Sequence, residues 1–336
     1  MRKGALALLV AIAAVAPARA NDSTAELTTG GLIFVHNPNV EMRSEDLHVS
    51  AKEIRVRYSF FNKSIQDVTV LVAFPLPDIK VDGPDDNISV PTDDPLNLLA
   101  FTTTVNGKPT ETKVEQRALA LGIDRTQLLR SLGIPLAPHL PATNQALDRL
   151  PPDKWEELLR TGLAEIEEYD AGQGMQKHLA ARWTLQTAYY WEQTFPAMAE
   201  TLIEHQYKPS VGAAVQTSLG APNVATESWY EEYKEKYCFS TDFLAELERA
   251  RTASGSKFGA PYGEERLDYI LKTGANWSGP IKDFRMVVDK GEADSLVSFC
   301  GQDVKTISDT QFEMRKVDYV PDGNLSVLIL RKLPPQ

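Results

Sequence analysis

Apolar and polar side chains alternate along several stretches of the chain. In residues 53–62 every second position is apolar, and charged or hydroxyl side chains fill the positions between. This period of two predicts a strand with one face in the core and one in water. Residues 68–74 (VTVLVAF) are apolar at nearly every position, which predicts a strand buried on both faces. Pro75 and Pro77 end this strand because proline cannot donate to a sheet ladder.

The spacing changes after residue 115. Apolar residues fall three and four apart in 126–132 and in 155–163, which predicts several short helices separated by prolines. A second helical stretch is predicted over 225–252.

Alternation returns over 182–195. A turn at 195–197 leads into 199–207, which we expect to be the hairpin partner of that strand. Further strands are predicted over 267–272, 281–289, 295–299, 311–315 and 325–331. The pattern as a whole predicts a mainly β protein, an antiparallel β-sandwich framework of one large or two packed sandwiches with α-helical insertions.

These elements suggest a division of the chain. We expect an N-terminal β-sandwich from residues 21–114 plus 180–215, interrupted by a helical insertion over 115–179. A C-terminal helical segment and β-domain would occupy 216–336. Residues 1–20 are typical of a secretory signal peptide, with a charged start, an apolar stretch of about ten residues and Ala18-Arg19-Ala20 before the cleavage point.

Cleavage after Ala20 would place the protein in the periplasm or outside the cell, not spanning the membrane. The formal charge of the whole chain is −11, and the leader carries only basic charges, so the remaining chain is acidic. That balance disfavours nucleic acid as a partner. Cys238 and Cys300 are the two cysteines, and in an oxidising compartment we expect them to form a disulfide.

Two short motifs resemble those of penicillin-binding serine enzymes. Ser254 and Lys257 fit S-x-x-K, and residues 272–274 read K-T-G. We interpret both as accidental, because Ser254 follows the end of a predicted helix and 273–280 reads as a hairpin loop between two strands. No catalytic motif, cofactor site or histidine metal spacing stands out, so we assign no catalytic residue and no cofactor.

Two groups of residues are candidates for binding. Asp82, Asp85 and Asp86 lie in an acidic, proline-rich loop that offers oxygen ligands to a cation such as calcium. Their spacing fits no calcium motif, so we favour a solvated surface loop. The second group is aromatic. Trp277 beside Asn276 at a loop tip, and Trp229 beside Tyr230, would form a stacking platform for a sugar or peptide, unless these rings fold back into the core.

Six stretches together resemble a family of exported bacterial proteins catalogued as domain of unknown function 4424. They are NDSTAELTTGGLIF (21–34), MRSEDLHVS (42–50), IRVRYSFFNKSIQDVTVLVAFPLPD (54–78), YYWEQTFPA (189–197), HQYKPSVG (205–212) and KTGANWSGPIKDFRMVVDKG (272–291). The resemblance implies export but supplies no activity. Residues 58–77 are also distantly similar to the start of vault/inter-alpha-trypsin-type β-sandwich domains, which implies a sandwich used in binding and assembly.

The sequence therefore favours a non-catalytic binding or interaction module of the bacterial cell envelope, with an envelope protein or glycan as its partner. Two alternatives stay open: a hydrolase acting on envelope carbohydrate or peptide, and a periplasmic carrier of a small ligand.

Overall fold

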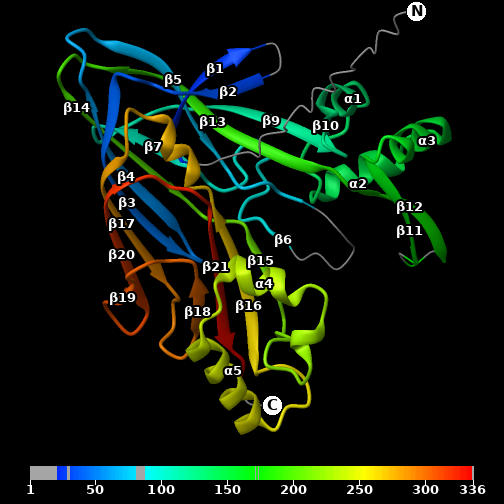
Figure 1. Ribbon diagram of the computed structural model, residues 1–336. Helices are drawn as coiled ribbons and strands as arrows, with labels where there is room; N and C mark the ends of the chain where they lie inside the picture. The colour runs from blue at the N-terminus through cyan, green and yellow to red at the C-terminus, as the bar shows by residue number, and fades with distance from the viewer. Residues whose placement is uncertain (1–20, 29–30, 81–87, 171, 173, 335–336) are drawn as a thin grey trace, which may run out of the picture.

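A computed structural model describes residues 21–28, 31–80, 88–170, 172 and 174–334. Its largest element is an eight-stranded sheet that runs along one side of the molecule (Figure 1). The order of its strands is β19 (Lys305–Thr306), β20 (Gln311–Tyr319), β17 (Ile281–Asp289), β3 (Val40–Ser50), β4 (Ile54–Asn62), β14 (Glu200–Tyr207), β7 (Thr102–Val105) and β8 (Lys108–Pro109). All neighbours are antiparallel except β17 and β3, which are parallel.

Two smaller sheets face different parts of this sheet. The six-stranded sheet has the order β10 (Ile123–Asp124), β9 (Lys113–Ala120), β13 (Thr184–Phe195), β5 (Val68–Pro75), β1 (Ser23–Thr28) and β2 (Gly31–Val35). The five-stranded sheet has the order β18 (Leu296–Phe299), β21 (Leu325–Lys332), β16 (Tyr262–Tyr269), β15 (Val211–Ala214) and β6 (Ile88–Ser89). The mainly β, antiparallel, sandwich-like architecture is as predicted.

One hydrophobic core joins the three sheets. It combines side chains such as Phe60 of β4, Phe74 of β5 and Val327 of β21, all of them fully buried. The alternation in β4 has the predicted effect, because Ile54, Val56, Tyr58 and Phe60 are buried while the arginines between them are exposed. In β5 the predicted burial on both faces holds for Val72, Ala73 and Phe74, whereas the first half of the strand is partly exposed.

The helices form two groups. The insertion carries α1 (Thr126–Ser131), α2 (Pro141–Asp148) and α3 (Pro152–Arg160), which pack with the hairpin β11 (Ala164–Asp170) and β12 (Met175–Ala181) and project to one side (Figure 1). The second group is η1 (Val224–Thr226), α4 (Tyr230–Tyr237) and α5 (Thr241–Ser254). α4 and α5 cover the outer face of the five-stranded sheet, where Phe243 and Leu247 contact the cluster that includes Leu328.

Two predicted hairpins are wrong. β13 pairs with β5 and β9 in the six-stranded sheet, whereas β14 pairs with β4 and β7 in the eight-stranded one. Likewise β16 and β17 belong to different sheets, and the segment between them contains the 3-10 helix η2 (Lys272–Asn276). In both cases the chain crosses from one layer of the sandwich to the other.

The predicted division into an N-terminal sandwich, an insertion and a C-terminal domain stays a prediction. Strands from 21–114 and from 216–336 share the eight-stranded sheet, because β17 lies beside β3.

The disulfide prediction is confirmed. Cys238 at the end of α4 is bonded to Cys300 just after β18, with an S–S distance of 2.05 Å. The bond ties the helical cover to one edge of the five-stranded sheet.

Candidate functional site

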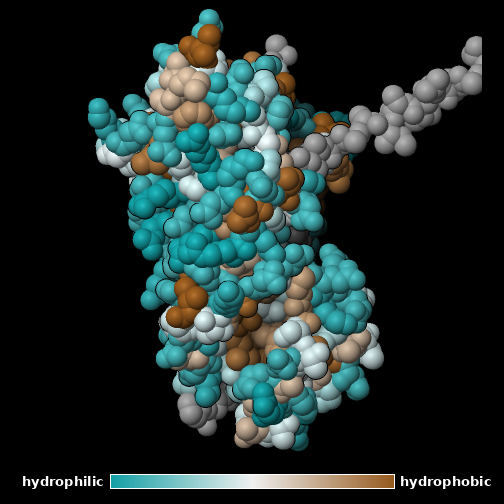
Figure 2. Space-filling view, turned by 60° about the vertical axis from the view of Figure 1, so that its left-hand side comes forward, coloured by the Kyte–Doolittle hydropathy of each residue, from teal (hydrophilic) through white to brown (hydrophobic). Residues whose placement is uncertain are grey.

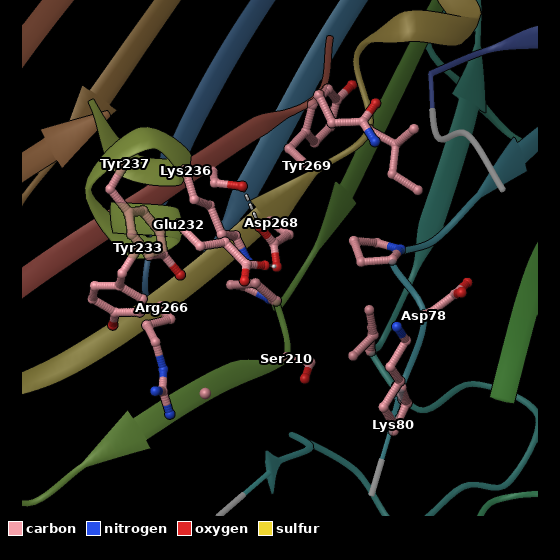
Figure 3. A pocket seen from close by; sticks show the side chains of 18 of the residues that line it. Asp78, Lys80, Ser210, Glu232, Tyr233, Lys236, Tyr237, Arg266, Asp268 and Tyr269 are labelled. Carbon is pink, nitrogen blue, oxygen red and sulfur yellow. Dashed lines mark hydrogen bonds and ion pairs between the residues drawn. The ribbon is translucent and has the colours of Figure 1, made fainter. Parts of the chain in front are cut away.

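A groove of about 780 Å³ opens where the three large sheets meet. Its lining comes from the segment after β5, the connection from β14 to β15, strand β16, the start of β21 and helix α4. Figure 3 shows the α4 and β16 side chains on one side and Asp78 and Lys80 on the other. Junctions of this kind are common positions for ligand sites.

Helix α4 and the residue before it form an aromatic wall. The lining residues here are Trp229, Glu232, Tyr233, Lys236 and Tyr237, which recur three and four apart and therefore share one face of the helix. The Trp229 and Tyr233 rings lie edge to face with centroids 5.6 Å apart, and the Tyr233 and Tyr237 rings are 4.7 Å apart. The wall thus offers one half-exposed indole backed by two tyrosines.

Strand β16 supplies charge beside this wall. Arg266 and Asp268 are two residues apart, so both point to the same face of the strand. Asp268 accepts a hydrogen bond from the Ser326 hydroxyl at 2.6 Å and one from Lys236 Nζ at 3.4 Å (Figure 3). Arg266 Nη1 lies 3.8 Å from a carboxylate oxygen of Glu264.

The facing wall is fixed by backbone pairing. Ile79 and Leu185 exchange two backbone hydrogen bonds of 3.0 and 2.8 Å, which hold the segment after β5 against β13. Asp78 accepts from Gln186 Nε2 at 3.3 Å, and desolvation raises the pKa of Asp78. Lys80 follows two residues later.

The groove therefore presents both signs of charge. Its cations are Lys80, Lys236 and Arg266, and its carboxylates are Asp78, Glu232 and Asp268. Such a lining suits a polar ligand that carries donors, acceptors and both charges, more than an apolar ligand or a polyanion.

A second polar cluster lies inside the molecule, around the first described residues. Asn21, Asp22 and Ser23 are fully buried. The segment 271–277 holds them through four contacts: Asn21 Nδ2 to Leu271 O at 3.2 Å, Thr273 Oγ1 to Asn21 O at 2.7 Å, Asn276 Nδ2 to Ser23 Oγ at 2.8 Å and Trp277 Nε1 to Asp22 O at 2.6 Å. We call this arrangement the N-terminal clasp.

Two acids lie in the clasp region. Asp22 Oδ1 contacts His205 Nε2 at 2.9 Å, and the other ring nitrogen of His205 lies 3.0 Å from Thr103 Oγ1. Burial raises the pKa of Asp22, and the contact with His205 opposes that rise. Glu45 of β3 accepts from Asn21 Nδ2 at 3.0 Å, and burial raises the pKa of Glu45 to about 8.

Of the two interpretations of Trp277, the structure supports the one in which the ring folds back into the core. The ring is fully buried, with its centroid 4.4 Å from Phe60 and 5.8 Å from Phe195. Asn276 is half-buried and engaged with Ser23. The segment is a crossover packed on the N-terminal strand, so no surface platform forms there.

The other predicted residues have mixed outcomes. Trp229 lines the groove, whereas Tyr230 is buried in the cluster beneath α4 and α5. The acidic trio Asp82, Asp85 and Asp86 lies outside the described residues. No group of three or more His, Cys, Asp or Glu side chains with metal-binding proximity occurs within the described ranges.

The serine-enzyme motifs do not come together. Ser254 is exposed at the end of α5 and donates to Arg251 O at 2.8 Å, whereas residues 272–274 belong to the clasp. These positions agree with our interpretation that both motif matches are accidental.

The molecular surface adds two observations. Figure 2 shows a mostly hydrophilic face with small separate apolar patches and a hollow with an apolar floor in its lower half. Among the described residues, no helix has both the length and the apolar composition that a membrane crossing requires.

Comparison with known proteins identifies a family and a distant similarity to solved structures. The model of the family described as a domain of unknown function (DUF4424) matches residues 20–328. No curated protein matches the chain. A crystal structure from Legionella pneumophila, described as a candidate nutrient binding protein, is similar over 93% of this chain and 70% of its own, with 16% identity and a TM-score of 0.44. A likeness of that size carries no argument about function.

Proposed function

The chain belongs to the family of domains of unknown function DUF4424, and within that family we propose that it is a non-catalytic binding protein that holds a polar peptide segment in its groove. The observation that carries the proposal is the lining of the groove, where cations and carboxylates surround an aromatic wall. A peptide presents amide donors and acceptors together with charges of both signs, and this lining complements each of them.

We propose that it does so as an exported protein of the cell envelope, after removal of residues 1–20. The charged and apolar pattern of that stretch supports export. The disulfide between Cys238 and Cys300 also supports it, since such bonds persist in oxidising compartments. The family match leaves out residues 1–19, as expected for a leader that is not part of the folded unit.

Binding is favoured over hydrolysis by the position of the acids. Asp22 and Glu45 have raised pKa values but are buried in the clasp and do not line the groove. Within the groove, Asp268 already accepts from Ser326 and Lys236. Asp78 lines the groove and desolvation raises its pKa, but both of its carboxylate oxygens already lie 3.3 Å from Gln186 Nε2, which favours the ionised form.

The carrier alternative is less well supported. A carrier of an apolar ligand is expected to enclose it in a cavity lined by apolar side chains, whereas six charged residues line this groove.

Fluorine NMR on chain labelled with 5-fluorotryptophan tests the proposal. The five tryptophans give five signals, and Trp229→Phe identifies the one in the groove. A pool of tetrapeptides with free charged termini is titrated in parallel with a pool of oligosaccharides. We expect the tetrapeptides to shift the Trp229 signal selectively.

Lys236→Ala should weaken peptide binding at least tenfold, because it removes a groove cation. Lys234→Ala is the matched control, since Lys234 lies on the same helix but pairs with Glu231 and does not line the groove. Peptides that leave the Trp229 signal unmoved would refute the proposal, and a shift with oligosaccharides alone would replace the peptide by a glycan.

A further inference from the structure

The buried cluster around Asn21 lacks hydrogen-bond donors. Asn21 Oδ1, Asp22 Oδ2 and Glu45 Oε1 are all buried, and each is without a partner among the described residues. Unpaired buried acceptors are costly, commonly about 1–3 kcal/mol each, so three of them in one cluster call for an explanation.

With both of its acids ionised, the cluster would also carry an excess of negative charge. Asp22 is matched by His205. Glu45 has Asn21 as its hydrogen-bond donor, and Asp22 adds a second negative charge nearby. The titratable groups that interact with these acids are Asp22, His205 and the tyrosines Tyr58, Tyr269 and Tyr319, so no lysine or arginine of the described chain offsets the charge of Glu45.

A group that fills both needs is the α-ammonium of Asn21. Asn21 Nδ2 is 3.0 Å from Glu45 Oε2, and the α-nitrogen of the same residue lies within about 5 Å of its own Nδ2 by covalent geometry. An ammonium group carries three N–H donors and one positive charge, which matches three unpaired acceptors and one unmatched acid.

We propose that the N-terminal clasp and Glu45 form an interior binding site for the α-ammonium of Asn21, created when the peptide bond between Ala20 and Asn21 is hydrolysed. A signal peptidase supplies the catalysis. Water adds its hydroxyl to the Ala20 carbonyl carbon, the C–N bond breaks, and the released amine takes up a proton to become the ammonium. The inference rests on the proposed export and on cleavage after Ala20, and it is independent of what the groove binds.

The clasp is built to fit this one residue. Thr273 holds the carbonyl of Asn21, and Leu271 O accepts from its side chain. Gly274 packs so closely that a Cβ there would lie 2.7 Å from Asn21 Nδ2. These contacts fix the position of Asn21, so its α-nitrogen has little conformational freedom left to lose when it pairs with an acceptor of the cluster.

The test compares two exported chains. One has the natural sequence, and the other carries a Gly-Ser insertion between Ala20 and Asn21, so its amino group is displaced by two residues. Sequencing of the purified chains establishes the first residue of each. Reductive dimethylation, followed by mass spectrometry, then measures how fast the α-amine reacts relative to the lysines.

We expect the α-amine of the natural chain to react at least tenfold more slowly than that of the insertion chain, because it is buried and paired. A purified chain that still begins at Met1 would overturn the export proposal and this inference together, and a first residue other than Met1 or Asn21 would overturn this inference alone. A first residue Asn21 whose amine reacts as fast as that of the insertion chain would overturn this inference alone.

Stability against pH gives a second readout. Without the ammonium, the pKa of Glu45 is about 8 in the folded chain and near 4.5 in the unfolded chain. Between these two values the folded chain keeps a proton on Glu45 that the unfolded chain has lost. Stability of the insertion chain should therefore fall between about pH 5 and pH 8, by roughly several hundredfold in the unfolding constant. The natural chain should lack this loss, because the ammonium lowers the pKa of Glu45, and should lose stability only above about pH 8 as the amine deprotonates.

Glu45→Gln keeps the shape of the side chain and removes its charge. In this background the two chains should show the same pH profile. A difference that persists in Glu45→Gln, or identical profiles of the two chains with Glu45 intact, would contradict the pairing of the ammonium with Glu45.

Discussion

Replacement of Trp277 measures how much the N-terminal clasp contributes to stability. The indole is fully buried, packs on Phe60 and Phe195, and donates to the Asp22 carbonyl at 2.6 Å. Trp277→Phe removes the donor and leaves that buried carbonyl unpaired, which costs about 1–3 kcal/mol. Trp277→Ala also opens a cavity, and large-to-small changes of this kind cost about 3–5 kcal/mol. We expect losses of about 3 kcal/mol for Trp277→Phe and about 5 kcal/mol for Trp277→Ala.

Urea denaturation followed by far-UV circular dichroism checks these values. Trp229→Ala is the control, because that ring is 37% exposed in the groove, and it should cost no more than about 1 kcal/mol. If Trp277→Ala lost less than about 1 kcal/mol, or less than Trp229→Ala, the ring would not be the core element described above. The Trp229 signal of Trp277→Phe should still respond to peptides, since Trp277 does not line the groove.

Two further predictions concern the C-terminal part of the chain. Replacing Cys238 and Cys300 together by serine opens a loop of 62 residues, which in the chain-entropy model costs about 4 kcal/mol of folding stability. The double variant should therefore unfold at a lower urea concentration than the disulfide-bonded protein, and an unchanged midpoint would contradict this. Gly259→Ala places a Cβ 2.0 Å from the backbone oxygen of Thr217, so we expect it to lower the free energy of unfolding by at least about 2 kcal/mol. Gly323→Ala is the control and should cost about 0.5 kcal/mol or less, because no atom lies within 4 Å of a Cβ there. Equal melting temperatures for the two glycine variants would show that the backbone around residue 259 yields freely.

The sequence predicts individual strands well because a strand with one wet face has a local pattern. β4 and β13 each alternate over most of their length. The sequence does not predict which strands pair with each other. β13 and β14 are joined by a short turn, as in a hairpin, but they lie in different sheets. Alternation says which face of a strand is buried, not which layer of the sandwich the strand joins.

The hairpin of β11 and β12 is a case in which the strand itself could not be predicted from the sequence. β11 reads AEIEEYD, and most of its side chains are exposed, so it lacks the apolar alternation that identifies a strand. It is held instead by its ladder with β12 and by Arg182, which pairs with Glu165 and Glu167. Such a strand forms because of its pairing partner, and the local sequence pattern carries no information about that partner.

The candidate site was only partly predictable for a similar reason. Trp229 stands out as a large ring in a polar stretch, but Lys236 and Arg266 look like ordinary solvated charges on a helix and a strand. They become neighbours because α4 packs over β16. Asn21 and Glu45 are 24 residues apart and acquire their relation only when the chain closes on segment 271–277.

The parallel pairing of β17 with β3 has a consequence for synthesis of the chain. β3 ends at residue 50, whereas β17 begins at residue 281, so one edge of β3 stays open until most of the polypeptide has emerged. An open strand edge is a template for association with other chains. We therefore expect a nascent molecule to need a chaperone, or delayed collapse, until about the last sixth of the chain arrives. Products truncated before residue 281 should aggregate rather than fold.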